Sequence, residues 1–358
     1  MPRPLHIIEP TLENYAGHCY GLVSSLCDAA RGQLSIYVWA GAGAKNLRFA
    51  AECEMHPYFK RRLRVAQEFL LLRRLFRDVD ARIVVTTAKR ADLVLARLVA
   101  SSTLPAGKLS LYFHWFRATP ARNAFLRKAA TAQPDITILA TTESVAETFK
   151  SAGFKRVVYL PYPLTATPPS YVAEEPGFRH LLYAGAARQD KGFKHIVDLV
   201  ELLNERGMNF PVTVQVSAEH YGKYDRATKE QLRRLERIGY PLLHLVRETL
   251  APDEYGNLFR GAICLQPYDR EEFNDRASGV TMDALIRGAP IITTSQSWMA
   301  RQISADNAGV TLDNPEAKSL LGAAESISRA YGIYRARALT AGESLRRRSW
   351  APLLSLLQ

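Results

Sequence analysis

The chain has 358 residues, 47% of them hydrophobic and 23% charged, which excludes a wholly disordered protein. No apolar run reaches the ~18 residues that a membrane-spanning helix needs. The four cysteines form no CxxC pair, which argues against a disulfide scaffold or a zinc module.

The net charge of +12 is unevenly distributed along the chain. Residues 1–165 contain 23 basic and 12 acidic residues, a net charge of +11, whereas the remainder is almost neutral. This asymmetry indicates a polyanionic partner for the first half, which can be nucleic acid, an anionic lipid surface or a phosphorylated substrate.

The first half alternates short apolar runs with amphipathic stretches. Strands are expected at residues 5–8, 34–39, 82–87, 109–113, 136–140 and 157–160. Helices are expected around residues 22–29 and at 58–77, 91–100 and 145–152. Because strands alternate with helices of about ten residues, this pattern predicts βαβ units around a parallel sheet.

Residues 161–178 contain five prolines, which disfavour both helix and central strand and therefore predict a linker. Beyond it the alternation restarts, with strands at 180–184, 212–216, 242–246, 262–266 and 291–294. Helices are expected there at 193–206, 228–238, 280–287, 319–331 and 335–357. The predicted organisation is an N-terminal domain (1–163), a linker (164–178), a second domain (179–330) and a helical segment (331–358) returning toward the first domain.

Two Rossmann-like α/β domains facing across a cleft are thus the expected fold class. In open parallel sheets, ligands bind at the carboxyl ends of the strands, so functional residues are expected in the loops that follow strands.

The loop after the strand at 180–184 contains Gly185, Arg188, Lys191 and Gly192. Gly185 permits a tight turn, and the two basic side chains can reach one anionic group. A helix N-terminus that favours anions follows Gly192. The alternative is a solvated loop in which Lys191 pairs with Asp190.

A second segment contains two carboxylates eight residues apart, Asp275 and Asp283. Between them, Ser278, Gly279 and Val280 lie at an expected helix start, where backbone amides can accept a diphosphate. The alternative is that Asp275 only caps this helix and Asp283 is an exposed helical acid.

Together these two segments resemble the donor-binding domain of the retaining glycosyltransferases of family 4, of the bacterial surface-polysaccharide type, which have the GT-B fold. That family shows an Arg-x-x-Lys-Gly turn after a strand, and later a Pro-Ser/Tyr loop, an acid-x7-acid segment and a Gly-x-Pro before a strand. Here these are Gly185–Gly192, Pro267-Tyr268, Asp275–Asp283 and Gly288–Pro290. The family usually has Glu at both acid positions, and Gly-Phe-Gly where this chain has Arg276-Ala277-Ser278.

The resemblance implies a metal-independent glycosyltransferase of the hexosyltransferase type that uses a UDP- or GDP-linked sugar and needs no cofactor. Arg188 and Lys191 would stabilise the leaving diphosphate, Asp283 would bind the ribose, and Asp275 would hold sugar hydroxyls. Further donor-binding positions are Gly17, Gly185, Ser278, Gly279, Val280 and Thr281, with Arg247 near the base. The lone Asp78-Val79-Asp80 is interpreted as a solvated turn rather than a metal site.

The same resemblance assigns the acceptor to the N-terminal half. Its first strand–helix loop supplies Asn14, Tyr15 and His18, and Arg117 follows a later strand. His114, directly after the strand at 109–113, resembles the family's active-site histidine. His18 and His114 also have a structural interpretation, as a helix cap and a locally bonded core histidine.

Residues 58–77, YFKRRLRVAQEFLLLRRLFR, are interpreted as one amphipathic basic helix. Phe59, Leu63, Ala66 and Leu70 would face the core, while the basic face touches an anionic membrane or a lipid-pyrophosphate-saccharide acceptor. We therefore expect a cytoplasmic protein that is peripheral on the inner face of the cytoplasmic membrane. A soluble acceptor, a catalytically degenerate nucleotide-binding protein and a basic nucleic-acid-binding protein are the alternatives, although no nucleic-acid motif is present and no nucleic acid is expected.

Overall fold

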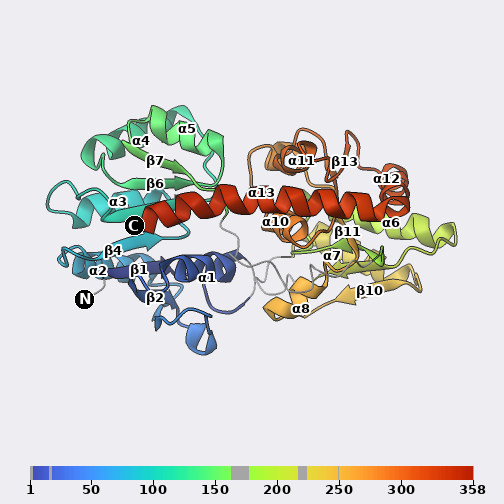
Figure 1. Cartoon of the computed structure of the whole chain (residues 1–358), viewed down its shortest axis with the longest axis horizontal. Coiled ribbons are helices and arrows are strands. Elements are labelled where there is room, and N and C mark those ends of the chain that lie inside the picture. Colours follow the sequence, from blue (N-terminus) through green and yellow to red (C-terminus); the bar gives the residue numbers. More distant parts are fainter. Residues whose placement is uncertain (1–2, 16–17, 163–176, 217–223, 249, 358) are drawn as a thin grey trace. The chain divides into compact units, whose positions relative to one another are not determined.

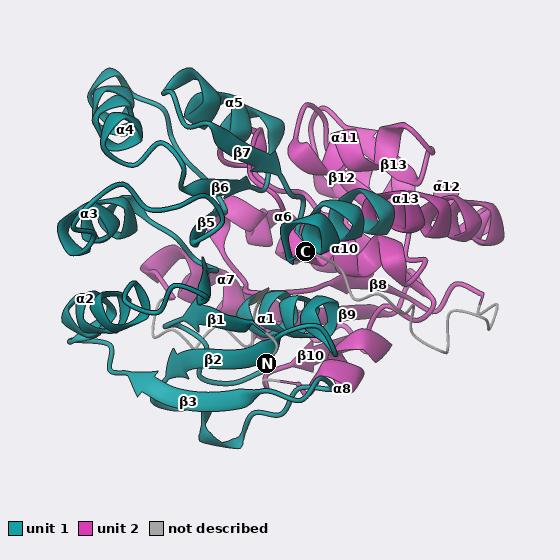
Figure 2. Ribbon diagram, turned by 60° about the vertical axis from the view of Figure 1, so that its left-hand side comes forward, with its two compact units in different colours: residues 1–166, 346–358 teal, residues 167–345 magenta. Residues whose placement is uncertain are grey.

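The computed structural model describes residues 3–15, 18–162, 177–216, 224–248 and 250–357. The chain divides into two compact units (Figures 1 and 2). Unit 1 comprises residues 1–166 and 346–358, and unit 2 comprises residues 167–345. Residues 163–176, most of the expected linker, lie outside the described residues.

Unit 1 is built on a seven-stranded sheet in the order β3-β2-β1-β4-β5-β6-β7, in which every pair is parallel. Its strands are β1 (Pro4–Glu9), β2 (Ser35–Gly41), β3 (Glu54–Phe59), β4 (Arg82–Val85), β5 (Leu109–Phe113), β6 (Thr137–Ala140) and β7 (Arg156–Tyr159). The strand order reverses between β1 and β4, which is where ligands bind in such sheets.

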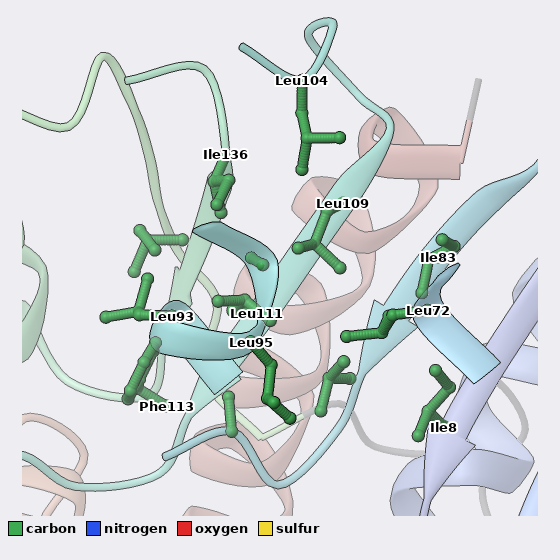
Figure 3. Packing of buried hydrophobic residues seen from close by; sticks show 14 of the residues in the cluster. Ile8, Leu72, Ile83, Leu93, Leu95, Leu104, Leu109, Leu111, Phe113 and Ile136 are labelled. Carbon is green, nitrogen blue, oxygen red and sulfur yellow. The ribbon is translucent and has the colours of Figure 1, made fainter. Parts of the chain in front are cut away.

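Helices cover this sheet. They are α1 (His18–Ala30), α2 (Arg64–Leu75), α3 (Arg90–Val99), α4 (Pro120–Ala132) and α5 (Glu143–Ser151), with a short 3-10 turn, η1 (Ala44–Asn46). Figure 2 shows α2, α3 and α4 side by side along one side of the sheet. Leu72 of α2 and Leu95 of α3 pack there into a buried cluster with strand residues such as Ile83 and Leu111 (Figure 3).

The expected helix over residues 58–77 is wrong in its first part. Residues 54–59 form the edge strand β3, and α2 begins only at Arg64. Pro57 favours a helix start in sequence, but an edge strand also accepts proline because one side of it makes no ladder hydrogen bonds.

The orientation expected for this helix is also wrong. Glu68, Leu71, Leu72 and Leu75 form its buried face. The stripe of Leu63, Ala66 and Leu70 is exposed, because it lies on the opposite side of the helix from those residues.

Two buried carboxyl groups connect α2 to α3. Glu68 is 1% exposed, and Asp92 of α3 lies beside it. Burial, the Asp92 charge and a hydrogen bond between the two side chains raise the pKa of Glu68 to about 9, although Arg64 nearby opposes the shift. Glu68 is therefore protonated at neutral pH.

We predict that the stability of unit 1 falls as the pH rises from about 4.5 to about 9. Over that window the folded chain holds a proton on Glu68 that the unfolded chain releases, and each pH unit costs at most ~1.4 kcal/mol. Glutamine has nearly the shape of a protonated glutamate but cannot release a proton. The free energy of urea unfolding of Glu68→Gln should therefore depend less on pH between 5.5 and 8.5. Glu230→Gln, on the exposed surface of unit 2, is the control, and equal pH dependence in both variants would contradict the prediction.

Unit 2 contains a six-stranded parallel sheet in the order β10-β9-β8-β11-β12-β13. Its strands are β8 (His180–Tyr183), β9 (Val212–Gln215), β10 (Leu243–Val246), β11 (Ala262–Gln266), β12 (Ile291–Thr294) and β13 (Gly309–Leu312). The helices are η3 (Gln189–Lys191), α6 (Phe193–Glu205), α7 (Arg226–Arg237), α8 (Pro252–Asn257), α9 (Arg270–Phe273), α10 (Gly279–Ile286), α11 (Trp298–Ser304) and α12 (Ala317–Arg329).

The last helix, α13 (Tyr331–Leu357), starts in unit 2, and its residues from Arg346 onward belong to unit 1. It packs tightly on α10, because a Cβ on Gly342 would lie 2.6 Å from the Leu285 carbonyl oxygen. In unit 1, Arg82 donates a hydrogen bond of 2.8 Å to the carbonyl oxygen of Leu357.

Candidate functional site

The candidate donor site of unit 2 begins at the carboxyl end of β8. Gly185 follows this strand with a φ of +92°, a conformation that favours glycine. Its backbone N–H donates to Gln215 Oε1 of β9 over 2.6 Å. Because the strand order of unit 2 reverses between β8 and β11, this loop lies at the position where such sheets bind ligands.

Three charged side chains, two of them from this loop, form a network. Arg188 donates to both carboxylate oxygens of Asp190, over 2.8 and 2.5 Å, and Arg276 contacts the same carboxylate at 3.4 Å. Arg276 comes from the segment between α9 and α10 and also stacks over the Phe273 ring. Asp190 therefore brings the two sequence motifs together.

Lys191 lies at the centre of the same site. Its Nζ is 5.3 Å from the centre of the Tyr268 ring and 3.1 Å from where a Cβ on Gly185 would lie. Val280 Cγ2 lies 3.3 Å from that same point. Burial, with a smaller contribution from the nearby guanidinium groups, lowers the pKa of Lys191 to about 8.

Gly192 ends the turn with a φ of +68° and lies directly against the loop after β11. A Cβ at this position would be 1.9 Å from the Pro267 carbonyl oxygen. A second backbone contact joins the same two loops: the Asp269 N–H, after β11, donates a hydrogen bond of 2.9 Å to the Asp190 carbonyl oxygen, after β8. Close backbone contact therefore holds the two loops together.

Helix α10 begins beside these loops. Ser278 is its N-terminal cap and is buried, and Gly279 is the first helical residue. Thr281 donates a hydrogen bond of 2.8 Å to Gln266 Oε1 at the end of β11. The four predicted donor residues from Ser278 to Thr281 thus lie at the carboxyl end of β11, and Val280 reaches Gly185.

Asp283 lies one turn into α10 with two partners. Tyr255 of α8 donates to its Oδ2 over 3.2 Å, and Arg287 contacts its Oδ1 at 3.1 Å. Burial raises the pKa of Asp283, while the Arg287 charge and these hydrogen bonds oppose the shift. The side chain is half-buried, so Asp283 is not the exposed helical acid of the alternative interpretation.

Two other predicted donor residues are placed less centrally. Asp275 is half-buried in the segment between α9 and α10, next to Arg276. Arg247, after β10, pairs with Glu236 of α7 over 2.6 Å. That contact directs its guanidinium to α7 rather than to the Gly185–Gly192 loop.

In unit 1, His114 follows β5 as predicted. Its Nε2 lies 2.7 Å from the Thr86 carbonyl oxygen, and because a carbonyl can only accept, Nε2 carries the proton. The His114 ring also contacts the Tyr112 ring edge-on, with 4.8 Å between the ring centroids. The centroid of the Tyr162 ring lies 5.6 Å from that of His114. His114 is thus oriented at the carboxyl end of the sheet.

A buried carboxylate lies at the strand reversal of the same sheet. Glu9 ends β1 and accepts hydrogen bonds from the side chains of Thr11, Thr86 and Thr87, those of Thr11 and Thr86 over 2.5 and 2.7 Å. Burial favours the neutral acid, but the combined hydrogen bonds hold the pKa of Glu9 below its usual value. This anionic group connects the ends of β1 and β4.

The remaining predicted residues of unit 1 lie in separate places. Asn14 and Tyr15 are half-buried in the loop before α1, where Tyr15 packs edge-on against Tyr20 at 4.8 Å. Arg117 stacks over Trp115 at 5.8 Å. His18 is the first residue of α1, and Gly17 lies outside the described residues.

Several residues of these sites are not predicted from the sequence. Asp190 is expected from the sequence only as a partner of Lys191, and its contact with Arg276 is not expected. The other residues that are not predicted are Glu9, Thr86, Thr87, Gln215 and Tyr255. The available signal is a polar residue at the end of a buried strand for Glu9 and Gln215, and directly after one for Thr86. Tyr255 had no comparable signal, because it reaches Asp283 from a different helix.

No group of three or more His, Cys, Asp and Glu side chains among the described residues is arranged to hold a metal ion. No helix in the described ranges combines the length and apolar character that crossing a membrane requires.

In sequence comparisons, no family model and no curated protein matches the chain. Comparison with solved structures gives matches over nearly the whole chain. HepE of Anabaena, in complex with UDP and glucose, has a TM-score of 0.67 at 12% identity, covering 98% of this chain and 97% of HepE. Trehalose-6-phosphate synthase OtsA has a TM-score of 0.68 at 12% identity, with 99% of each chain covered. WaaG, a glycosyltransferase involved in lipopolysaccharide biosynthesis, has a TM-score of 0.57 at 14% identity, with 96% and 95% covered.

These similarities concern the fold, because the identities are low. The expected fold class, two Rossmann-like parallel-sheet domains of the GT-B kind, is confirmed by both sheets and by the structural neighbours. Membership of family 4 stays a prediction. The chain therefore has the GT-B fold.

Proposed function

We propose that this protein transfers a sugar, with retention of configuration, from a nucleotide-sugar donor to a saccharide acceptor. The observation that carries the proposal is the convergence of Arg188, Lys191 and the first turn of α10 at the carboxyl ends of β8 and β11. The neighbours HepE, which is seen with UDP and glucose, and WaaG support the same class of reaction.

In the proposed reaction the bond between the sugar and the diphosphate breaks, and negative charge develops on the leaving phosphate. Arg188 and Lys191 stabilise that charge, as preorganised donors do in electrostatic catalysis. The new bond forms on the same face of the sugar, and the leaving phosphate accepts the proton of the acceptor hydroxyl. Asp275 holds sugar hydroxyls, and Asp283, positioned by Tyr255 and Arg287, accepts hydrogen bonds from the ribose.

Metal independence is part of the proposal. Arg276 adds a third cation to Arg188 and Lys191, and Asp190 neutralises only one of the three charges. Two net positive charges remain to balance a diphosphate, supported by the N-terminus of α10. A divalent cation is then unnecessary for holding the leaving group.

The acceptor is proposed to bind unit 1 and to be lipid-linked. The net charge of +11 on residues 1–165 supports a lipid-pyrophosphate-saccharide, on the inner face of the cytoplasmic membrane. Asn14, Tyr15, His18 and Arg117 are the proposed acceptor contacts, and His114 lies close to the transferred sugar.

The test is thermal unfolding of the full chain with UDP, GDP and their sugar conjugates, with and without a chelator. A nucleotide at 100 times its dissociation constant should add about 2.7 kcal/mol of stability. We expect one base to raise the Tm in the presence of chelator, and Arg188→Ala and Asp283→Ala to abolish that rise. Arg233→Ala, an exposed arginine on α7, is the matched control.

Three results would contradict parts of the proposal. A Tm that no nucleotide moves would remove the donor site. A rise lost on chelation would remove metal independence. Aspartate stands at both acid positions, so a nucleotide-dependent rise without sugar transfer to any saccharide acceptor would favour the degenerate nucleotide-binding alternative.

A further inference from the structure

The outer surface of α2 and α3 exposes several large apolar side chains. Leu63, which precedes α2, is 53% exposed and Leu70 is 57% exposed. On α3, Val94 is 40% exposed and Leu98 is 66% exposed. Large apolar side chains on one contiguous face are typical of interaction sites, whereas single ones are ordinary.

These side chains share one face because of helix periodicity. Positions 63, 66 and 70 are separated by three and four residues and lie opposite the core-facing Leu71, Leu72 and Leu75. Positions 91, 94 and 98 have the same spacing on α3, opposite the buried Leu95 and Ala96. The two helices pack side by side on the sheet, as Figure 2 shows, so both stripes point outward from the same layer. We call this surface the α2–α3 face.

The charge of the α2–α3 face has one sign. The exposed basic residues on and beside the two helices are Lys60, Arg61, Arg62, Arg73, Arg74, Arg77, Lys89, Arg90 and Arg97. Each helix contains one acid, Glu68 and Asp92, and both are buried. Asp78 and Asp80 are exposed, but they lie in the turn beyond the end of α2.

We infer that the α2–α3 face docks unit 1 on an anionic lipid bilayer, with the four apolar side chains inserted between headgroups and the basic residues around them in contact with lipid phosphates. Apolar residues on one helical face with arginine and lysine at its borders are the pattern of interfacial helices. Arginine stems can cover apolar surface while their guanidinium groups reach phosphate. An anionic bilayer matches both features of this face, because its phosphates pair with the basic residues and its apolar interior accepts the exposed leucine and valine side chains.

The exposed stripe of α2 is the one that the sequence pattern assigns to the core. The sequence pattern assigns Leu63, Ala66 and Leu70 to the core and predicts that only the basic side chains contact lipid. The structure places that stripe outside, so insertion and charge act on the same surface. The connection to a lipid-linked acceptor rests on the proposed function, whereas the binding of lipid by this face does not.

The experiment is co-sedimentation of the full chain with vesicles of phosphatidylglycerol and phosphatidylcholine, and with vesicles of phosphatidylcholine alone. We expect binding to the anionic vesicles and at least tenfold less to the neutral ones, because each basic residue near the surface contributes on the order of fivefold. Leu70→Ser/Leu98→Ser should reduce partitioning into anionic vesicles about tenfold or more. Arg73→Glu/Arg97→Glu should reduce it further and lower its dependence on salt.

The matched controls are Ile333→Ser, a 58% exposed apolar residue of unit 2, and Arg226→Glu/Arg233→Glu on α7. Neither should change vesicle binding. Because all these side chains are exposed, each variant should keep the wild-type Tm and the nucleotide-dependent Tm shift of the donor site. That shift separates failure of the docking face from failure of the proposed transfer reaction.

Equal binding to neutral and anionic vesicles, or binding unchanged in the leucine variant, would overturn the inference. So would a wild-type chain that forms a dimer in sedimentation and becomes monomeric in the leucine variant without binding vesicles, because the occupant of the face would then be a second copy.

Discussion

Gly192→Ala is expected to destabilise unit 2 by roughly 3 kcal/mol or more and to abolish the nucleotide-dependent Tm shift. The left-handed φ of +68° alone costs an alanine about 1 kcal/mol. The larger cost is steric, since the new Cβ would lie 1.9 Å from the Pro267 carbonyl oxygen. This clash is relieved only if the loops after β8 and β11 move apart. Because those loops contain Lys191 and Tyr268, the movement would also disrupt the candidate donor site.

Two glycine substitutions separate these contributions. Gly239→Ala has a similar φ of +66° with no atom within 4 Å of the new Cβ, so it should show the backbone cost alone. Gly279→Ala has open space and no left-handed φ, so its unfolding free energy should be near that of the wild type. Urea unfolding of the three variants checks the order, and a Gly192→Ala loss no larger than that of Gly239→Ala would contradict the steric argument.

Lys191→Met is expected to lower kcat by about 10²–10³-fold while the chain stays folded. Methionine keeps most of the apolar stem over the Tyr268 ring but removes the charge that would face the leaving diphosphate. Removing the partly desolvated ammonium group should leave the unfolding free energy unchanged or slightly higher. The control is Lys194→Met, three residues further on, whose Nζ pairs with Asp198 on the exposed side of α6.

The lowered pKa of Lys191 predicts that nucleotide binding depends on pH. With a pKa of about 8, Lys191 of the free protein loses its proton as the pH rises past that value, so affinity for a diphosphate should fall above pH 8. Lys191→Met should bind more weakly and lack this dependence. Isothermal titration with the nucleotide diphosphate between pH 6.5 and 9.5 measures both, and a parallel decline in wild type and variant would exclude Lys191 as its source.

Much of the candidate donor site was accessible from sequence because it depends on local order. A strand that ends at a glycine and continues into a basic turn must present that turn at the carboxyl edge of a parallel sheet. Gly185, Arg188, Lys191 and the start of α10 therefore lie where the pattern predicts. The contacts of Asp190 with Arg276 and of Asp283 with Tyr255 join segments distant in sequence, and no local pattern reports such pairs.

Local patterns also determined the alternation of strands and helices, because buried parallel strands need apolar runs and the covering helices need one apolar stripe. They could not decide how residues 58–77 divide or which way α2 faces. Pro57 fits both a helix start and an edge strand, and the neighbouring β2 decides between them. Helix α2 carries two apolar stripes, and only packing against the sheet selects Leu71, Leu72 and Leu75 as the buried one. Leu63 and Leu70 are left exposed among arginines by that choice of tertiary packing.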